Sequence, residues 1–296
     1  MGAIILIILL VVAGLIIKYK FNSWMAQGNA QNQAIISQIN AAKNGDVEAM
    51  FWLGMYYLEE RSQLKNLSSR RAEDLKNRSV HWFMQAVECG DTRSMLTLAR
   101  QYCSVFNTDQ SGETLITNNS GFGYDPEEEL ALTRMAAEAG DASGQYRLAT
   151  LINDDRNKLY WLEQSANQGY FRAYQALGDY YRQQFSSNNK KETLAKAEYY
   201  YYLAMRSNDD FICSQAAYQL GEIFGKKYYF GKDPERSAYW FFQSYLWGNE
   251  YAKKHLDEII ENAKITISEN KYQQWRSDFE NHHYLTDELI ITQSTK

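Results

Sequence analysis

The side chains that most often carry acid–base, nucleophilic or metal chemistry are few in this sequence, and their spacing does not combine them. Adjacent histidines such as His282 and His283 point to different sides of a helix, so they form no ready chelate. His81 stands beside Trp82, where a histidine packed in the core or solvated is expected. The histidines are His81, His255, His282 and His283.

The cysteines and carboxylates give the same result. Cys89, Cys103 and Cys213 are too scattered for a disulfide framework or a thiolate metal site. Cys103 has no paired histidine motif, so we expect a small buried apolar residue and not a nucleophile. The acidic run 127–129 lies at a predicted helix start, where carboxylates meet the positive end of the helix dipole. The sequence therefore predicts no catalytic residue, no metal site and no cofactor.

Composition excludes other classes of protein. The chain has 296 residues, of which 45% are hydrophobic and 23% charged, as in a globular protein. Its net charge of −5 argues against nucleic acid, because non-specific binding to phosphates needs clustered Lys and Arg.

The body of the chain contains an internal repeat. A turn residue ends each unit, and a small residue follows it after four positions, or after eight in the fifth unit, where four residues are inserted. Four and five positions further on, a leucine stands beside a second small residue. The turn residues are Gly45, Gly90, Gly140, Gly169, Asn208 and Gly248, and the small residues are Ala49, Ser94, Gly144, Ala173, Ala216 and Ala252. The pairs are Leu53-Gly54, Leu98-Ala99, Leu148-Ala149, Leu177-Gly178 and Leu220-Gly221.

A second helix is predicted before each closing turn. A large residue stands eight positions before the turn, and Asp or Thr seven positions earlier is expected to cap the helix start. Pro126 and Pro234 directly follow two of these aspartates, at the helical position where a missing N–H costs nothing. The large residues are Trp82, Leu132, Trp161, Tyr200 and Trp240; the expected caps are Asp125, Asp154, Thr193 and Asp233, with Leu75 at this place in the first unit.

The pattern A-x-x-x-L-G-x-x-Y, then D-x-x-K-A-x-x-W, then A-A-E-x-G resembles the Sel-one-like repeat family, which is related to tetratricopeptide repeats. The match covers about residues 45–250; Leu98-Ala99, Leu148-Ala149 and a third unit with almost no inter-helix loop depart from it. The resemblance implies a right-handed α-superhelix that serves as a protein-binding scaffold, commonly in bacterial envelope, secretion or signalling assemblies. It implies no reaction.

The expected fold is therefore all-α: a right-handed α-solenoid of about five helix-turn-helix repeats over residues 35–264. We expect a leading cap helix over 35–44. Trailing cap helices are expected over 251–264 and 269–284, with 265–296 forming the C-terminal capping helix and tail. Two long loops, 59–76 and 104–124, offer a second binding surface.

The amino terminus carries a membrane signal. Residues 1–17 are apolar or Gly, about 26 Å of helix, which is near the short limit for a span. We expect one N-terminal transmembrane helix within an anchor over 1–20 and a polar linker over 21–34; a cleaved signal peptide is the alternative. Lys18 and Lys20 favour a cytoplasmic body, whereas an uncleaved signal sends the body outward. The expected location is the inner membrane, single-pass, with a periplasmic array.

A partner protein is expected to bind in a groove along the first helices. Counting from the small residue, offsets 0, +4 and +8 form the core stripe, so offsets +3 and +6 face nearly away from it. This row is basic toward its beginning and acidic toward its end. The predicted partner-binding residues are Trp52, Tyr56, Arg100, Arg147, Asp179, Tyr180 and Glu222. A merely solvated inner face explains the same row equally well.

Three functions fit these features. The first is a membrane-anchored, non-catalytic scaffold that binds another protein in a bacterial envelope or secretion assembly. The second is an immunity protein that neutralises a secreted toxin in the periplasm. The third is an enzyme of unrecognised type, which requires a convergent cluster of His, Cys or carboxylates in one pocket.

Overall fold

The computed structural model describes residues 32–63, 69–103, 105–108, 114–117, 122–188, 190–225 and 233–281. The chain divides into two compact units, Met1–Ala139 and Gly140–Lys296, which are described separately. The predicted transmembrane segment 1–17, the anchor 1–20 and most of the linker 21–34 lie outside the described residues. No helix in the described part of the chain has the length and apolarity needed to cross a membrane.

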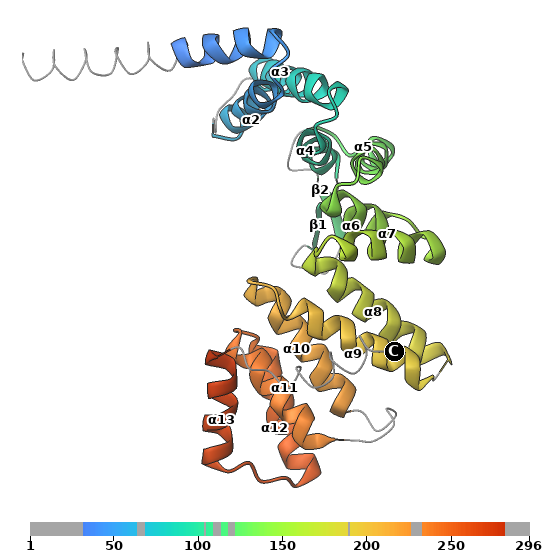
Figure 1. Ribbon diagram of the computed structural model, residues 1–296. Helices are drawn as coiled ribbons and strands as arrows, with labels where there is room; N and C mark the ends of the chain where they lie inside the picture. Colours follow the sequence, from blue (N-terminus) through green and yellow to red (C-terminus); the bar gives the residue numbers. More distant parts are fainter. Residues whose placement is uncertain are drawn as a thin grey trace, which may run out of the picture. The chain divides into compact units, whose positions relative to one another are not determined.

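The first unit contains two helix pairs behind a leading helix over residues 32–43 (Figure 1). Its elements are α2 (Val47–Gln63), α3 (Ser69–Glu88), α4 (Thr92–Tyr102), β1 (Val105–Thr108), β2 (Thr114–Thr117) and α5 (Pro126–Glu138). The first pair is α2 with α3, and the second is α4 with α5.

The second unit contains three further pairs and two trailing helices (Figure 1). Its elements are α6 (Ala142–Leu151), α7 (Asp155–Asn167), α8 (Phe171–Asn188), α9 (Lys191–Ala204), α10 (Asp210–Gly225), α11 (Pro234–Leu246), α12 (Glu250–Ala263) and α13 (Glu269–Glu280). The predicted all-α architecture of five helix pairs with helical caps is confirmed.

The turns between units are built as the sequence predicts. The five turn glycines have φ between 79° and 91°, a left-handed conformation that Gly adopts without steric cost. Asn208 is not among the residues with positive φ. The predicted small residues and leucines are all buried, and the five leucines are 0% exposed.

In three of the helix pairs, a ring of the second helix packs directly on a glycine of the first. An added Cβ on Gly54 would lie 2.6 Å from the Phe83 ring, and one on Gly221 would lie 2.7 Å from the Phe241 ring. Gly178 and Tyr201 repeat this contact, also at 2.7 Å. Glycine is therefore required on the first helix wherever an aromatic ring of the second helix packs against it.

The two repeats without this glycine have a smaller residue in place of the ring on the second helix. The ring occupies the seventh position before the closing turn of a repeat. The second and third repeats have Thr133 and Leu162 at this position. Both residues are 0% exposed, and Ala99 and Ala149 take the place of the glycine. Each methyl group added on one helix is therefore matched by a smaller side chain on the other.

The same pairs with a glycine carry a cation against an aromatic ring. Arg236 lies 4.0 Å from the Phe224 ring centroid, Lys196 lies 5.1 Å from that of Tyr181, and Arg78 lies 5.7 Å from that of Tyr57. Such contacts stabilise by about 0.5–1 kcal/mol at exposed sites. The second and third repeats have Glu128 and Asn157 at the position of the cation.

Aspartates cap at least six of the described helices. Asp125, Asp154 and Asp233 accept hydrogen bonds from backbone N–H groups three residues later, as predicted. Asp46, Asp91 and Asp141 do the same at the first helices. The Gly-Asp dipeptide at those turns was the available signal for this second set.

Two predictions about boundaries were wrong. Thr193 is no cap, because α9 begins at Lys191 and Thr193 lies inside its first turn. Leu75, which departs from the cap pattern in the first repeat, lies within α3 and is fully buried. Helices α2 and α3 cover most of the expected loop 59–76.

The segment 104–124, expected to be a loop, contains a small hairpin. Strands β1 and β2 pair antiparallel, with Val105 opposite Thr117 and Thr108 opposite Thr114. Val, Phe, Thr, Leu and Ile in these runs favour strands. The repeat pattern does not extend into this insertion, so it carried no information about its structure.

The trailing helix α13 closes the second unit. Trp275 is 5% exposed and packs edge-on against Tyr239, with ring centroids 5.5 Å apart. The Gln243 side-chain amide donates to the Trp275 carbonyl oxygen at 2.8 Å. The apolar side of the last pair is thereby covered, as a solenoid end requires.

We predict that Gly221→Ala destabilises the chain by about 1–3 kcal/mol, because the new methyl group overlaps the Phe241 ring. Phe241→Leu should relieve this overlap, as in the third unit, where Ala149 and Leu162 stand at the same positions. Unfolding followed by circular dichroism for both single variants and the double variant gives the coupling energy. Strictly additive effects would contradict the proposed overlap; Gln219→Ala on the same helix serves as the control.

Candidate functional site

The predicted row begins with an aromatic pair in the first unit. Trp52 is 39% exposed and stacks on Tyr56, with ring centroids 5.4 Å apart and planes 11° apart. Met55, one turn along α2, is 40% exposed. Trp52 and Met55 are exposed, and Tyr56 is half-buried against the core, so together they form an aromatic surface of the kind enriched at protein interfaces.

The predicted basic residues differ in exposure. Arg100 is exposed near the end of α4, where its Nε atom donates to the Leu96 carbonyl oxygen at 3.3 Å. Arg147 on α6 is half-buried, so part of this side chain belongs to the packing of the second unit. Trp52, Tyr56 and Arg100 lie in the first unit, and the other predicted residues lie in the second.

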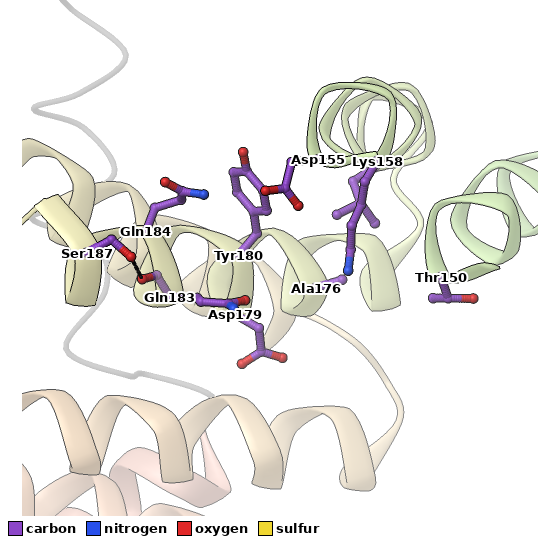
Figure 2. Close-up of a pocket in the computed structure, with 10 residues that line it drawn as sticks. Thr150, Asp155, Lys158, Ala176, Asp179, Tyr180, Gln183, Gln184 and Ser187 are labelled. Carbon is purple, nitrogen blue, oxygen red and sulfur yellow. Dashed lines mark hydrogen bonds between the residues drawn. The ribbon is translucent and has the colours of Figure 1, made fainter. Parts of the chain in front are cut away.

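Asp179 and Tyr180 line one pocket of the second unit, between α7 and α8 (Figure 2). Its volume is about 360 Å³. Most of its walls are polar, and Leu162 and Ala176 are its apolar residues. The lining residues are Thr150, Asp155, Lys158, Leu162, Ala176, Asp179, Tyr180, Gln183, Gln184 and Ser187.

Unequal helix lengths create this pocket. The first helix α6 has 10 residues, whereas the next first helix, α8, has 18. At about 1.5 Å per residue, the extra eight residues extend α8 by about 12 Å. Tyr180, Gln183, Gln184 and Ser187 lie on the second half of α8 and are left lining open space.

The Asp179 carboxylate also has a structural role. The Tyr201 hydroxyl donates to its Oδ1 atom at 2.7 Å. Burial raises the pKa of Asp179, and this hydrogen bond and the charge of Arg182 oppose the rise. Burial also raises the pKa of Tyr201, which therefore stays a donor.

Glu222 lies outside this pocket. It is half-buried on α10, where its charge adds to the effect of burial in raising the pKa of Tyr218. Of these three predicted residues, Asp179 and Tyr180 thus line the pocket and Glu222 does not.

Sequence reasoning missed the residues of α7 that line the pocket. Asp155 and Lys158 belong to a second helix, and the predicted groove was assigned to first helices alone. A second pocket, of about 500 Å³ between α11 and α13, was also missed. The Lys271 ammonium and the Glu235 carboxylate, which form an ion pair, both line it.

The described residues that were considered for chemistry do not come together; His282 and His283 lie outside the described residues. His81 packs edge-on against Trp82, and His255 stacks on Phe241, with ring centroids 5.4 Å apart. Burial raises the pKa of the Cys213 thiol to about 12, so this thiol stays protonated. Cys103 is half-buried, not fully buried as expected. Within the described ranges, no group of three or more His, Cys, Asp or Glu side chains could hold a metal ion.

Comparison with known proteins identifies similar folds. No family model and no curated protein matches the sequence. A protective antigen of uropathogenic Escherichia coli, with an SLR fold, is 18% identical; the match covers 89% of this chain and 51% of the antigen, with a TM-score of 0.59. A Sel1 repeat protein from Oxalobacter formigenes is 20% identical over 82% of this chain and 95% of its own, with a TM-score of 0.53.

An immunity protein from Pseudomonas aeruginosa is 17% identical over 77% of this chain and 81% of its own, but its TM-score of 0.40 is too low to support an inference. The chain spans about half the length of the E. coli antigen. At these identities the similarity concerns the fold, and the predicted resemblance to Sel-one-like repeats is confirmed at that level.

We predict that Asp179→Asn changes the pH dependence of stability. Because the folded pKa is raised, the protonated carboxyl favours folding below the unfolded pKa of about 4, and that contribution is lost as pH rises. The amide keeps an acceptor for Tyr201 and carries no charge, so the variant should be the more stable protein at pH 7 and differ little at pH 3. Denaturant melts across this range measure the difference. Tyr201→Phe, which removes the donor, should lower stability at pH 7; identical pH profiles for wild type and Asp179→Asn would refute this role of burial.

Proposed function

We propose that this chain, which has the Sel-one-like repeat fold, is a non-catalytic scaffold that binds another protein. The observation that carries the proposal is the predicted row itself. In every repeat the small residue and the leucine of the first helix are buried, whereas Trp52 and Arg100 of the row are exposed and its other residues are half-buried. The repeats therefore leave one side of each first helix at least partly accessible to a partner.

The composition of the row supports protein recognition. Trp52 and Tyr56 stack rigidly, so binding orders few additional rotamers there. Arg100 adds a positive charge in the first unit, and Asp179 and Glu222 add negative charges in the second. Mixed charge around an aromatic anchor favours a protein partner with complementary charges.

Membrane attachment is part of the proposal and rests on the sequence alone. Residues 1–17 contain no charged side chain and are long enough for a short span. We place the repeats on the periplasmic side of the inner membrane, where an envelope or secretion assembly or a delivered toxin is available as partner.

We predict that Trp52→Ala and Arg100→Glu each weaken partner binding about tenfold or more, the loss of about 1.4 kcal/mol expected of an interface anchor. The partner is first identified by crosslinking in cells, and its dissociation constant is then measured with purified proteins. Arg134→Glu is the matched control, because Arg134 is exposed on the second helix α5.

The outcomes separate the functions. If both variants bind the partner as tightly as the wild type, the predicted groove is not the binding site. A captured toxin, together with rescue of growth by this chain, would identify an immunity protein. Turnover of a small molecule by the purified chain would contradict a non-catalytic role.

We also predict that the intact chain stays in the membrane fraction after carbonate extraction. Deletion of residues 1–17 should release it, because no other stretch is proposed to anchor it. A reporter enzyme that is active only outside the cytoplasm should be active when fused after Lys296. Activity of the cytoplasmic reporter instead would reverse the proposed orientation, and full release of the intact chain by carbonate would exclude the anchor.

A further inference from the structure

The pocket between α7 and α8 contains two charged side chains that form no ion pair with the described residues. Neither Asp155 nor Lys158 forms a salt bridge with any residue that the structure describes. Both lie on α7, one helical turn apart, and Figure 2 shows them pointing toward α8. A carboxylate that is not paired within the protein remains available to a ligand.

The end of the pocket at Asp155 is suited to a cation. Figure 2 shows the Asp155 carboxylate beside the Tyr180 ring. The charges that raise the pKa of Tyr180, after burial itself, are those of Asp155 and Glu163, so the potential there is negative. Lys158 lies one turn further along α7 and faces Ala176, which leaves the Asp155 end open to an incoming positive charge (Figure 2).

A carboxylate next to an aromatic ring favours guanidinium over ammonium. The planar guanidinium donates two parallel hydrogen bonds to a carboxylate and stacks on an aromatic face. A lysine ammonium is a more strongly hydrated point charge and satisfies both contacts less well. The chemistry of this end of the pocket therefore matches arginine.

The remaining wall is suited to a peptide backbone. The side-chain amides of Gln183 and Gln184 form no hydrogen bonds within the part of the chain that the structure describes. An amide side chain offers a donor and an acceptor, as a peptide group does. The volume of about 360 Å³ is at the small end of ligand sites, which are about 300–1,000 Å³, and suits one side chain with its backbone.

We infer that this pocket receives an arginine side chain of the partner protein, with the guanidinium between Asp155 and Tyr180 and the adjacent backbone against Gln183 and Gln184. The inference rests on the proposed function, because it states the chemistry of the partner. It adds a site on α7 and α8 to the row of first-helix residues.

The test uses the full chain and three small probes: N-acetyl-arginine amide, the neutral isostere N-acetyl-citrulline amide, and N-acetyl-glutamate amide. We expect N-acetyl-arginine amide to bind saturably with a millimolar dissociation constant by NMR titration, and N-acetyl-citrulline amide to bind at least tenfold more weakly. Asp155→Asn and Tyr180→Leu should each weaken N-acetyl-arginine amide at least tenfold. Glu192→Gln, an exposed acid in the first turn of α9, should change nothing.

The inference is overturned if the arginine and citrulline probes bind equally, if Asp155→Asn has no effect, or if N-acetyl-glutamate amide binds more tightly through Lys158. The proposed function fails separately. A partner whose binding depends on Trp52 but not on Asp155 would support the scaffold function and contradict the arginine pocket. Arginine binding at Asp155 without any protein partner would support the pocket and contradict the scaffold function.

Discussion

The close contact between a ring and a glycine sets the geometry of the repeats. The Phe83, Tyr201 and Phe241 rings lie 2.6–2.7 Å from the place of a missing Cβ, so each ring packs directly on the glycine backbone of the facing helix. Where alanine replaces the glycine, Thr133 or Leu162 replaces the ring. The residue on one helix of a pair therefore limits the size of the residue that faces it on the other.

The same division runs through the other contacts of each pair. The three pairs with a ring on a glycine also carry a cation against an aromatic residue of the first helix. In the first and fifth pairs, a buried serine hydroxyl also donates to the carbonyl oxygen of that glycine, at 2.8 Å. The second and third pairs lack both the ring and the cation. Two kinds of packing thus produce one repeat fold.

Most of this architecture is readable from residue types and offsets. The turn glycines, the leucine beside a small residue and the caps at Asp125, Asp154 and Asp233 each follow from one local requirement. Thr193 was misplaced because a cap depends on where the loop ends, and the hairpin at 105–117 was missed because an insertion does not obey the repeat. The pocket needed the structure, because its walls come from different helices whose relative lengths no offset encodes.

Those helix lengths also determine where a site can arise in a regular array. A repeat whose helices match its neighbours covers all of its apolar surface and leaves little space between side chains. When α6 ends after 10 residues and α8 continues for 18, the overhang exposes side chains that have no neighbour of the same repeat position. Polar residues such as Gln183 and Gln184 at an overhang cost little stability, because their amides remain solvated until a ligand pairs with them. The irregular positions of this chain therefore add a site to the row of first-helix residues, which occupies regular positions of the repeat.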